Sequence, residues 1–171
     1  MRILAVCGSL QASSANRTLL ETAARLAPAG VELVLFDGLR DLPHFDPELE
    51  ATGGIEAVEK WRRALAESDA VLVASPEYGH SLPGSLKNAI DWVIGSGELE
   101  RKTVAITAAV PGSERGRRGL QALRDTLGAV SATIVGGEPI ARGASFEREV
   151  AALVAALVAE VEAQRAHAEN R

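Results

Sequence analysis

Short, continuous apolar runs alternate with segments of helical periodicity along the chain. An apolar run without alternation is typical of a strand that is buried on both faces of a sheet. Such runs cover residues 3–6, 31–36, 70–74, 103–109 and 132–135. We therefore predict five strands.

Between and after these runs, apolar residues recur at the spacing of one helix face. The last such segment is the most regular and combines Val150, Leu153, Val154, Leu157, Val158 and Val161. The segment that Pro83 and Gly84 open is expected to bury Leu86, Ala89, Ile90, Val93 and Ile94. Three other helices are expected near Asn16, Ile55 and Gly119, and residues 167–171 are expected to fray.

Strands that alternate with amphipathic helices predict an α/β fold, in which helices cover both faces of a parallel sheet. The length suits a doubly wound, flavodoxin-like, five-stranded sheet of order 2-1-3-4-5 better than the six-stranded Rossmann order, although sequence does not fix strand order. In such folds ligands bind beyond the carboxyl ends of the strands. The segments of interest are therefore residues 8–16, 37–47, 75–84 and 108–119.

Composition adds limits to this picture. The 171 residues suffice for one domain with a core, so we expect a single domain over residues 1–171. The net charge of −5, without a basic block, argues against DNA or RNA as partners. The only cysteine, Cys7, fits a reducing cytoplasm. We see no secretory signal and no apolar run that could span a membrane, so we expect a soluble cytoplasmic protein with no membrane partner.

The loop after the first strand, residues 8–16, reads GSLQASSAN. Its hydroxyl groups, its open backbone and the N-terminus of the following helix suit a terminal phosphate, which needs many converging donors. The lysine of a Walker A loop is missing, and so is the GxGxxG pattern of dinucleotide sites. The alternative interpretation is an ordinary N-capping loop, with Ser13 or Ser14 as the cap.

The loop and helix after the third strand, residues 75–92, read SPEYGHSLPGSLKNAIDW. Prolines and glycines predict a rigid turn that could present backbone groups to the polar edge of a flat ring. Each side chain also has a structural interpretation. In that interpretation Glu77 bonds within the turn, His80 lies on the surface, Tyr78 covers the edge of the core, Lys87 and Asp91 form a helix-surface ion pair, and Trp92 lies in the core or an interface.

Taken together, these segments resemble the NADPH-dependent FMN reductase family, which includes quinone, azo-dye and chromate reductases. Residues 76–92 resemble the family signature PEYNxSxPGxLKNAIDW. Residues 8–16 are similar to its phosphate loop GSxRxxSxN at Gly8, Ser9, Ser14 and Asn16. Residues 38–50 also look like the family's segment between the second strand and the second helix.

The resemblance implies bound FMN, NAD(P)H as electron donor, a small electron acceptor, and a homodimer or homotetramer. It also implies a set of cofactor-binding residues. For the FMN phosphate these are Ser9, Gln11, Ser14, Ala15 and Asn16, and for the isoalloxazine ring Pro76, Glu77, Tyr78, Gly79, His80 and Ser81.

The sequence departs from the family pattern in three places. Gln11 stands where arginine is usual, so one charge-assisted phosphate contact is missing and weaker FMN binding is expected. Gly79 replaces the commoner asparagine. Residues 116–118 read GRR where two glycines are frequent, and Arg115, Arg117 and Arg118 are read as surface residues, with the 2′-phosphate of NADPH as the alternative partner.

The expected function is therefore an FMN-dependent NAD(P)H oxidoreductase, whose acceptor is a free flavin, quinone, azo compound or chromate. The flavin carries the difficult chemistry, so we name no catalytic residue and no metal ligand. Three alternatives stay open. They are a flavodoxin-type electron carrier, a non-enzymatic FMN sensor, and a Rossmann-type dehydrogenase with Asp37 on the ribose.

Overall fold

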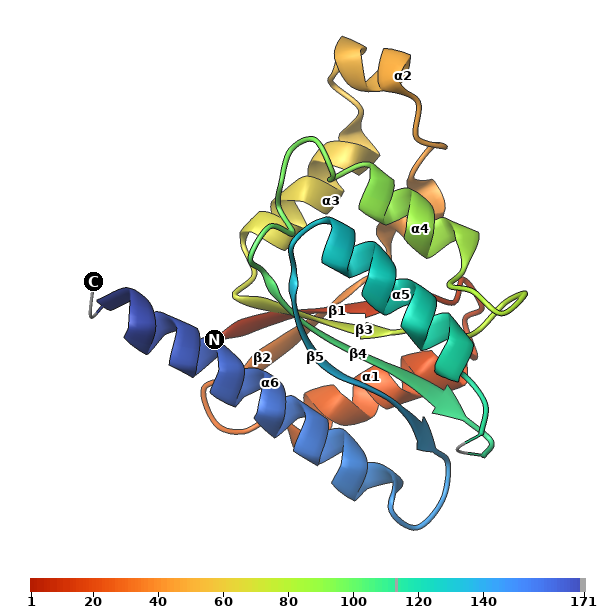
Figure 1. Ribbon diagram of the computed structural model, residues 1–171, viewed down its shortest axis with the longest axis vertical. Coiled ribbons are helices and arrows are strands. Elements are labelled where there is room, and N and C mark those ends of the chain that lie inside the picture. The colour runs from red at the N-terminus through yellow and green to blue at the C-terminus, as the bar shows by residue number, and fades with distance from the viewer. Residues whose placement is uncertain (113, 170–171) are drawn as a thin grey trace.

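A computed structural model describes residues 1–112 and 114–169 as a five-stranded parallel sheet between two layers of helices (Figure 1). The strands are β1 (Arg2–Cys7), β2 (Glu32–Phe36), β3 (Ala70–Ala74), β4 (Thr103–Val110) and β5 (Thr133–Ala141). The helices are α1 (Ala15–Leu26), α2 (Pro47–Thr52), α3 (Glu56–Ala66), α4 (Gly84–Asp91), α5 (Arg117–Ala129) and α6 (Phe146–Glu169), with a short 3-10 helix η1 (Gly38–Asp41).

The strand order is β2-β1-β3-β4-β5, and all neighbouring strands run parallel. The flavodoxin-like order expected from the sequence is therefore confirmed. In this order the chain moves outward in one direction from β1 to β2 and in the other from β3 to β5, so the switch lies between β1 and β3. The loops that leave β1 and β3 consequently meet above the sheet.

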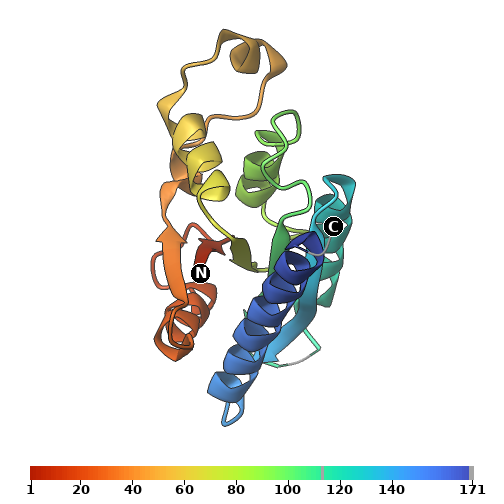
Figure 2. The same ribbon diagram turned by 90° about the vertical axis from the view of Figure 1, so that its left-hand side faces the viewer.

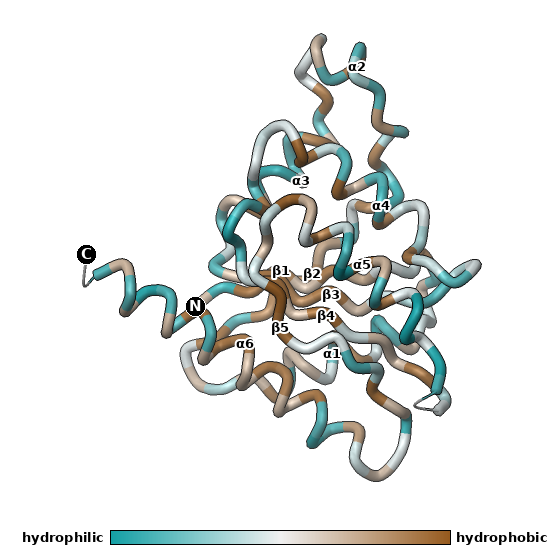
Figure 3. Tube along the Cα trace, in the orientation of Figure 1, coloured by the Kyte–Doolittle hydropathy of each residue, from teal (hydrophilic) through white to brown (hydrophobic). Residues whose placement is uncertain are grey.

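Each face of the sheet has its own apolar core (Figures 1 and 2). Helices α3, α4 and α5 cover one face, with Trp61 and Leu65 of α3 fully buried there. Helices α1 and α6 cover the other face, with Leu19 and Leu157 at its centre. Burying one such leucine stabilises the fold by roughly 2 kcal/mol. Figure 3 shows the resulting concentration of apolar residues in the strands.

The segment between β2 and α3 contains structure that periodicity did not predict. After β2 the chain forms η1 and then α2, which Asp46 caps by accepting a hydrogen bond from Glu48 N at 2.8 Å. Helix α2 buries none of its residues and extends away from the sheet (Figure 1). Such a short helix without an apolar face leaves no hydrophobic signal in the sequence.

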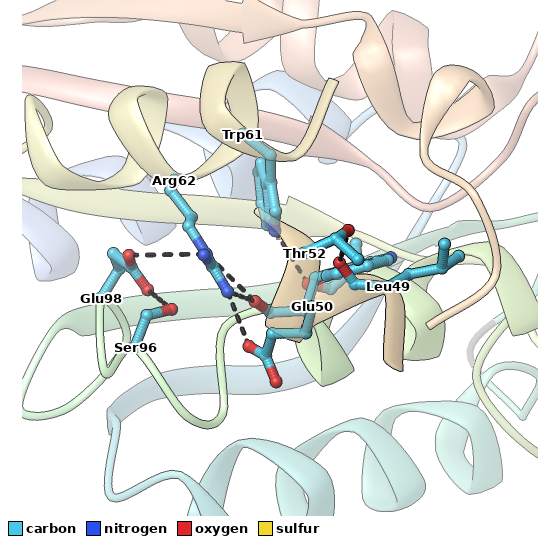
Figure 4. A network of polar contacts seen from close by, with 9 residues as sticks. Leu49, Glu50, Thr52, Trp61, Arg62, Ser96 and Glu98 are labelled. Atoms are coloured by element: carbon cyan, nitrogen blue, oxygen red, sulfur yellow. Dashed lines mark hydrogen bonds and ion pairs between the residues drawn. The ribbon is translucent and has the colours of Figure 1, made fainter. Parts of the chain in front are cut away.

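Arg62 of α3 connects helix α2, which we call the α2 arm, to α3 and to the segment after α4 (Figure 4). Its Nη2 donates to Glu50 Oε1 of α2 at 2.8 Å and to the carbonyl of Trp92 at 2.9 Å. Its Nε lies 4.0 Å from Glu98 Oε1. One guanidinium therefore links α2, α3 and the segment after α4.

Three details of the predicted elements are wrong. Ile94 is 57% exposed, because α4 ends at Asp91 and residue 94 no longer lies on its buried face. Strand β5 continues past Val135 to Ala141. Gly136 and Gly137 have positive φ angles and absorb a register shift in the pairing with β4, so the strand pairs again beyond the two glycines. Helix α6 continues through His167 to Glu169, so the fraying expected from residue 167 is not observed there, and residues 170–171 lie outside the described part.

None of the helices in the described ranges has the length and apolar character needed to cross a membrane.

Candidate functional site

The loop after β1 is built around the start of α1. Ser14 caps the helix, since its Oγ accepts a hydrogen bond from Asn16 N at 3.2 Å. Ser9 Oγ accepts from Gln11 N at 3.2 Å. The capping interpretation is thus confirmed for Ser14. It leaves the phosphate prediction open, because each hydroxyl still has a proton to donate.

Asn16 joins this loop to the end of β4. The side chain is buried, at 4% exposure, and its Oδ1 accepts a hydrogen bond from Ala109 N at 2.8 Å. The side-chain amide group remains available as a donor. Asn16 therefore positions the predicted phosphate loop against the neighbouring loop after β4, a role that the sequence did not indicate.

The loop after β3 forms a tight two-residue turn. Tyr78 and Ser81 exchange two backbone hydrogen bonds of 3.0 Å each, and Gly79 and His80 between them have φ angles of +56° and +62°. Glycine and asparagine tolerate this left-handed conformation best, which explains why Gly79 can stand in the family's asparagine position. Tyr78 is 56% exposed, so the idea that it covers the edge of the core is wrong.

Glu77 connects this turn to helix α5. Its Oε2 accepts a hydrogen bond from Gly119 N at 2.9 Å, and its Oε1 lies 3.3 Å from His80 Nδ1. The bond from Gly119, reinforced by the contact with His80, holds the pKa of the Glu77 carboxyl below its ordinary value. A Cβ atom at position 119 would lie 3.0 Å from Glu77 Cα, so this close approach requires glycine.

Between the loops after β3 and β4 lies a cavity of about 600 Å³. This is a common volume for a small-molecule or cofactor site. Its lining consists of Pro76, Glu77, His80, Ala108, Ala109, Val110, Pro111, Glu114, Arg115, Gly116, Arg117 and Arg118. The β4–α5 loop that closes it turns at Gly116, where φ is +86° and a Cβ would lie 3.1 Å from Val110 Cγ1.

The three arginines of this lining differ in their partners. Arg117 forms an ion pair with Glu138, with Nη1 and Oε2 2.7 Å apart. This structural contact accounts for Arg117 without a ligand. Arg115 and Arg118 form no ion pair within the described chain and remain exposed at the cavity.

The structure therefore separates the sequence-predicted residues into groups. Pro76, Glu77 and His80 line the cavity, whereas Tyr78, Gly79 and Ser81 shape the adjoining turn. The residues of the phosphate loop do not line this cavity but lie next to it through the contact between Asn16 and Ala109.

The remaining candidates have structural roles. Lys87 and Asp91 form the expected ion pair at 2.6 Å, and Trp92 is buried, with its Nε1 donating to the carbonyl of Pro43. Asp37 pairs with Arg17. Cys7 is buried, and burial raises the pKa of its thiol, which disfavours the reactive thiolate.

The donor set of these loops fits FMN. Hydroxyl groups and the N-terminus of α1 surround the position for a phosphate. The cavity beside Pro76 and Glu77 has room for the ring, and its walls offer backbone groups of residues 108–111. Gly8 keeps the loops close together, because a Cβ there would lie 3.1 Å from Ser75 Oγ. The sequence indicated these loops as the candidate site but gave no sign of the contacts of Ala109 and Gly119, because backbone amides carry no side-chain signal.

Comparisons with known proteins agree with this geometry. The family model described as NADPH-dependent FMN reductase matches residues 1–145. An NAD(P)H-dependent FMN reductase of Pseudomonas aeruginosa is 37% identical over 119 residues, which are 70% of this chain and 63% of the relative, less than two thirds of its length. A quinone reductase of Escherichia coli is 32% identical over 130 residues, covering 74% of this chain and 69% of the relative.

Among solved structures, the flavoenzyme NAD(P)H:(acceptor) oxidoreductase FerB of Paracoccus denitrificans superposes with a TM-score of 0.82 at 27% identity. The superposition covers 94% of this chain and 97% of that one. The matched family model extends from the phosphate loop through the cavity to the loop after β5, so it includes every predicted site residue. The chain belongs to the NADPH-dependent FMN reductase family.

Proposed function

We infer that this protein is an FMN-dependent NAD(P)H oxidoreductase that reduces a small acceptor such as a free flavin, a quinone, an azo compound or chromate. One observation carries the proposal: Asn16 joins the start of α1 to the end of β4, and Glu77 joins the loop after β3 to the first turn of α5, so the predicted phosphate loop lies beside the cavity between the loops after β3 and β4. This arrangement at the carboxyl ends of the strands is what a bound flavin requires.

Within this site we assign two groups of residues. Ser9, Gln11, Ser14, Ala15 and Asn16 would face the FMN phosphate, and Pro76, Glu77, Tyr78, Gly79, His80 and Ser81 would face or support the ring. When bound, FMN would supply the redox chemistry by accepting hydride from NAD(P)H and passing the electrons to the acceptor.

The residues of the chain would then act by binding and positioning. Glu77, whose lowered pKa keeps it ionised, holds the ring loop against the first turn of α5. The left-handed turn at Gly79 and His80 fixes the backbone that would face the ring. The open lining beside Arg115 and Arg118 leaves room for a donor and then an acceptor to approach in turn.

We further propose a cytoplasmic location and a homodimeric or homotetrameric assembly. The single buried cysteine agrees with a reducing compartment. The assembly follows from the family resemblance.

The visible absorption spectrum tests the function. Protein mixed with FMN and then desalted should retain the flavin bands, and anaerobic addition of NADPH or NADH should bleach them. Retained bands that do not bleach would favour an electron carrier or a sensor. A protein that neither retains FMN nor oxidises NAD(P)H when FMN is added would overturn the proposal.

A further inference from the structure

The predicted phosphate loop carries no positive charge of its own. Residues 8–16 contain neither lysine nor arginine. A phosphate monoester carries about −1.5 to −2 charges near neutral pH. Hydroxyl groups and backbone amides can donate hydrogen bonds to it, but charge-assisted bonds from a cation are roughly twice as strong. Any cation that strengthens the binding of this phosphate therefore comes from another part of the chain.

Arg17, the nearest arginine in sequence, is already neutralised. Its Nη1 and Nη2 lie 2.7 and 3.3 Å from the two carboxylate oxygens of Asp37. Its Nε lies 3.3 Å from Glu21 Oε1. Two carboxylates thus surround one guanidinium, which leaves no net positive charge for a ligand.

Arg40 reaches the loop from η1. Its Nη2 donates a hydrogen bond to the carbonyl oxygen of Leu10 at 2.5 Å, within the loop itself. A guanidinium has five N–H donors, so this bond leaves most of them free. No carboxylate of the described chain forms an ion pair with Arg40. The contact therefore holds an uncompensated positive charge beside the loop.

Arg142 reaches the loop from the segment between β5 and α6. Together with Gly143 and Phe146 it lines a cavity of about 360 Å³, whose other wall is Ser13, Ala15 and Thr18 of the phosphate loop and α1. Its backbone N donates to the carbonyl of Val110 at 2.9 Å, next to the Ala109 amide that Asn16 binds. Arg142 is exposed and forms no ion pair within residues 1–112 and 114–169.

We propose that Arg40 and Arg142 supply the positive charge for the FMN phosphate and so take the place of the cation that the loop lacks. The inference rests on the proposed function, because it assumes that FMN is the ligand. It assigns the recognition of the phosphate to two elements that are distant in sequence from the loop. Phosphate binding then depends on charge from η1 and from the end of β5, and FMN is favoured over riboflavin.

The dissociation constants of FMN and riboflavin, measured by quenching of flavin fluorescence, test this inference. Riboflavin has the same ring without the phosphate, so it reports on the fold and on the ring site within each variant. We expect Arg40→Gln and Arg142→Gln each to weaken FMN binding about tenfold, the usual effect of removing a hydrogen bond to a charged group. Riboflavin binding should change less than about twofold, which lies within the effect of an ordinary surface substitution.

Two further variants sharpen the result. Arg148→Gln removes an exposed arginine of α6 that lines neither cavity, and it should leave FMN binding unchanged. Gln11→Arg places a cation inside the loop, and in the double variant of Arg40 and Arg142 it should recover much of the lost FMN affinity. The FMN affinity of the unaltered protein should also fall with added salt more steeply than that of the double variant.

Several outcomes would overturn the inference. A double variant that binds FMN as tightly as the unaltered protein would do so, as would equal losses for FMN and riboflavin. An unaltered protein that binds FMN and riboflavin equally would also refute it while leaving the proposed function in place. An unaltered protein that binds neither flavin would refute both.

Discussion

Ser14 caps α1, and the proposed function gives it a second role, in binding the FMN phosphate. Its oxygen accepts the hydrogen bond that begins α1, and a serine hydroxyl that accepts a hydrogen bond can also donate one, here to a phosphate in the proposed site. Because the structural role needs an acceptor and the binding role tolerates no negative charge, substitutions can separate the two. Asparagine and aspartate both cap helices about as well as serine does.

We therefore expect Ser14→Asp to abolish FMN retention while leaving the melting temperature within a few degrees of the original. The carboxylate caps α1 but repels the phosphate. Ser14→Asn is the matched control, since it caps without a charge and should retain FMN more tightly than Ser14→Asp. The measurement is flavin content after desalting, together with thermal unfolding of the flavin-free protein. Unchanged FMN affinity in Ser14→Asp would remove the phosphate from this loop.

At the level of elements, the site depends on contacts between loops that the chain separates widely. Glu77 and Gly119 join the loop after β3 to the first turn of α5, and Arg62 joins α3 to the α2 arm. In both contacts a charged side chain forms a hydrogen bond to a group of another element. Removing either side chain should therefore cost more than an ordinary surface substitution.

The Glu77 contact should depend on pH. Its folded pKa is lowered, so the stabilisation is complete above the ordinary glutamate value of 4.5 and is lost as pH falls through the lowered folded value. At neutral pH we expect Glu77→Gln to reduce the free energy of unfolding by about 1 kcal/mol. The difference between the two proteins should shrink in acid below the ordinary glutamate pKa. Urea unfolding at several pH values measures it, and a difference that is constant down to strongly acidic pH would contradict an ionised Glu77.

The Arg62 contact should hold the α2 arm in place. Arg62→Met keeps an unbranched apolar stem but removes the guanidinium and leaves Glu50 and the Trp92 carbonyl without their donor, so we expect a loss of about 1–3 kcal/mol in the free energy of unfolding. Arg63→Met is the matched control, because Arg63 is the exposed neighbour on the same helix and should change stability by less than about 0.5 kcal/mol. Proteolysis should also cut the α2 region faster in the Arg62 variant. Equal behaviour of the two variants would show that the arm is held by other contacts.

At the scale of the whole molecule, the sequence predicts the elements that have a repeating apolar pattern. It does not predict short elements without such a pattern or contacts between residues that are far apart in the chain. Buried strands and helices repeat an apolar pattern, so β3 was predicted to the residue, and length and alternation favoured the sheet order that the structure shows without fixing it. Helix α2 has no apolar face, and the end of β5 passes through glycines and a proline that normally interrupt strands. The contacts of Asn16 with Ala109 and of Glu77 with Gly119 involve backbone amides 93 and 42 residues away, which no local pattern reveals.

The same long-range contacts predict where FMN should stabilise the protein. A ligand that binds only the folded state at a hundred times its dissociation constant raises the free energy of unfolding by about 2.7 kcal/mol. Because the site joins loops after β1, β3 and β4, we expect this gain to appear as slower amide hydrogen exchange in residues 8–16, 75–81 and 108–112. Helix α2 makes no contact with the cavity, so its exchange should stay unchanged and serves as the internal control. Protection confined to a single loop would mean that the three loops do not act as one site.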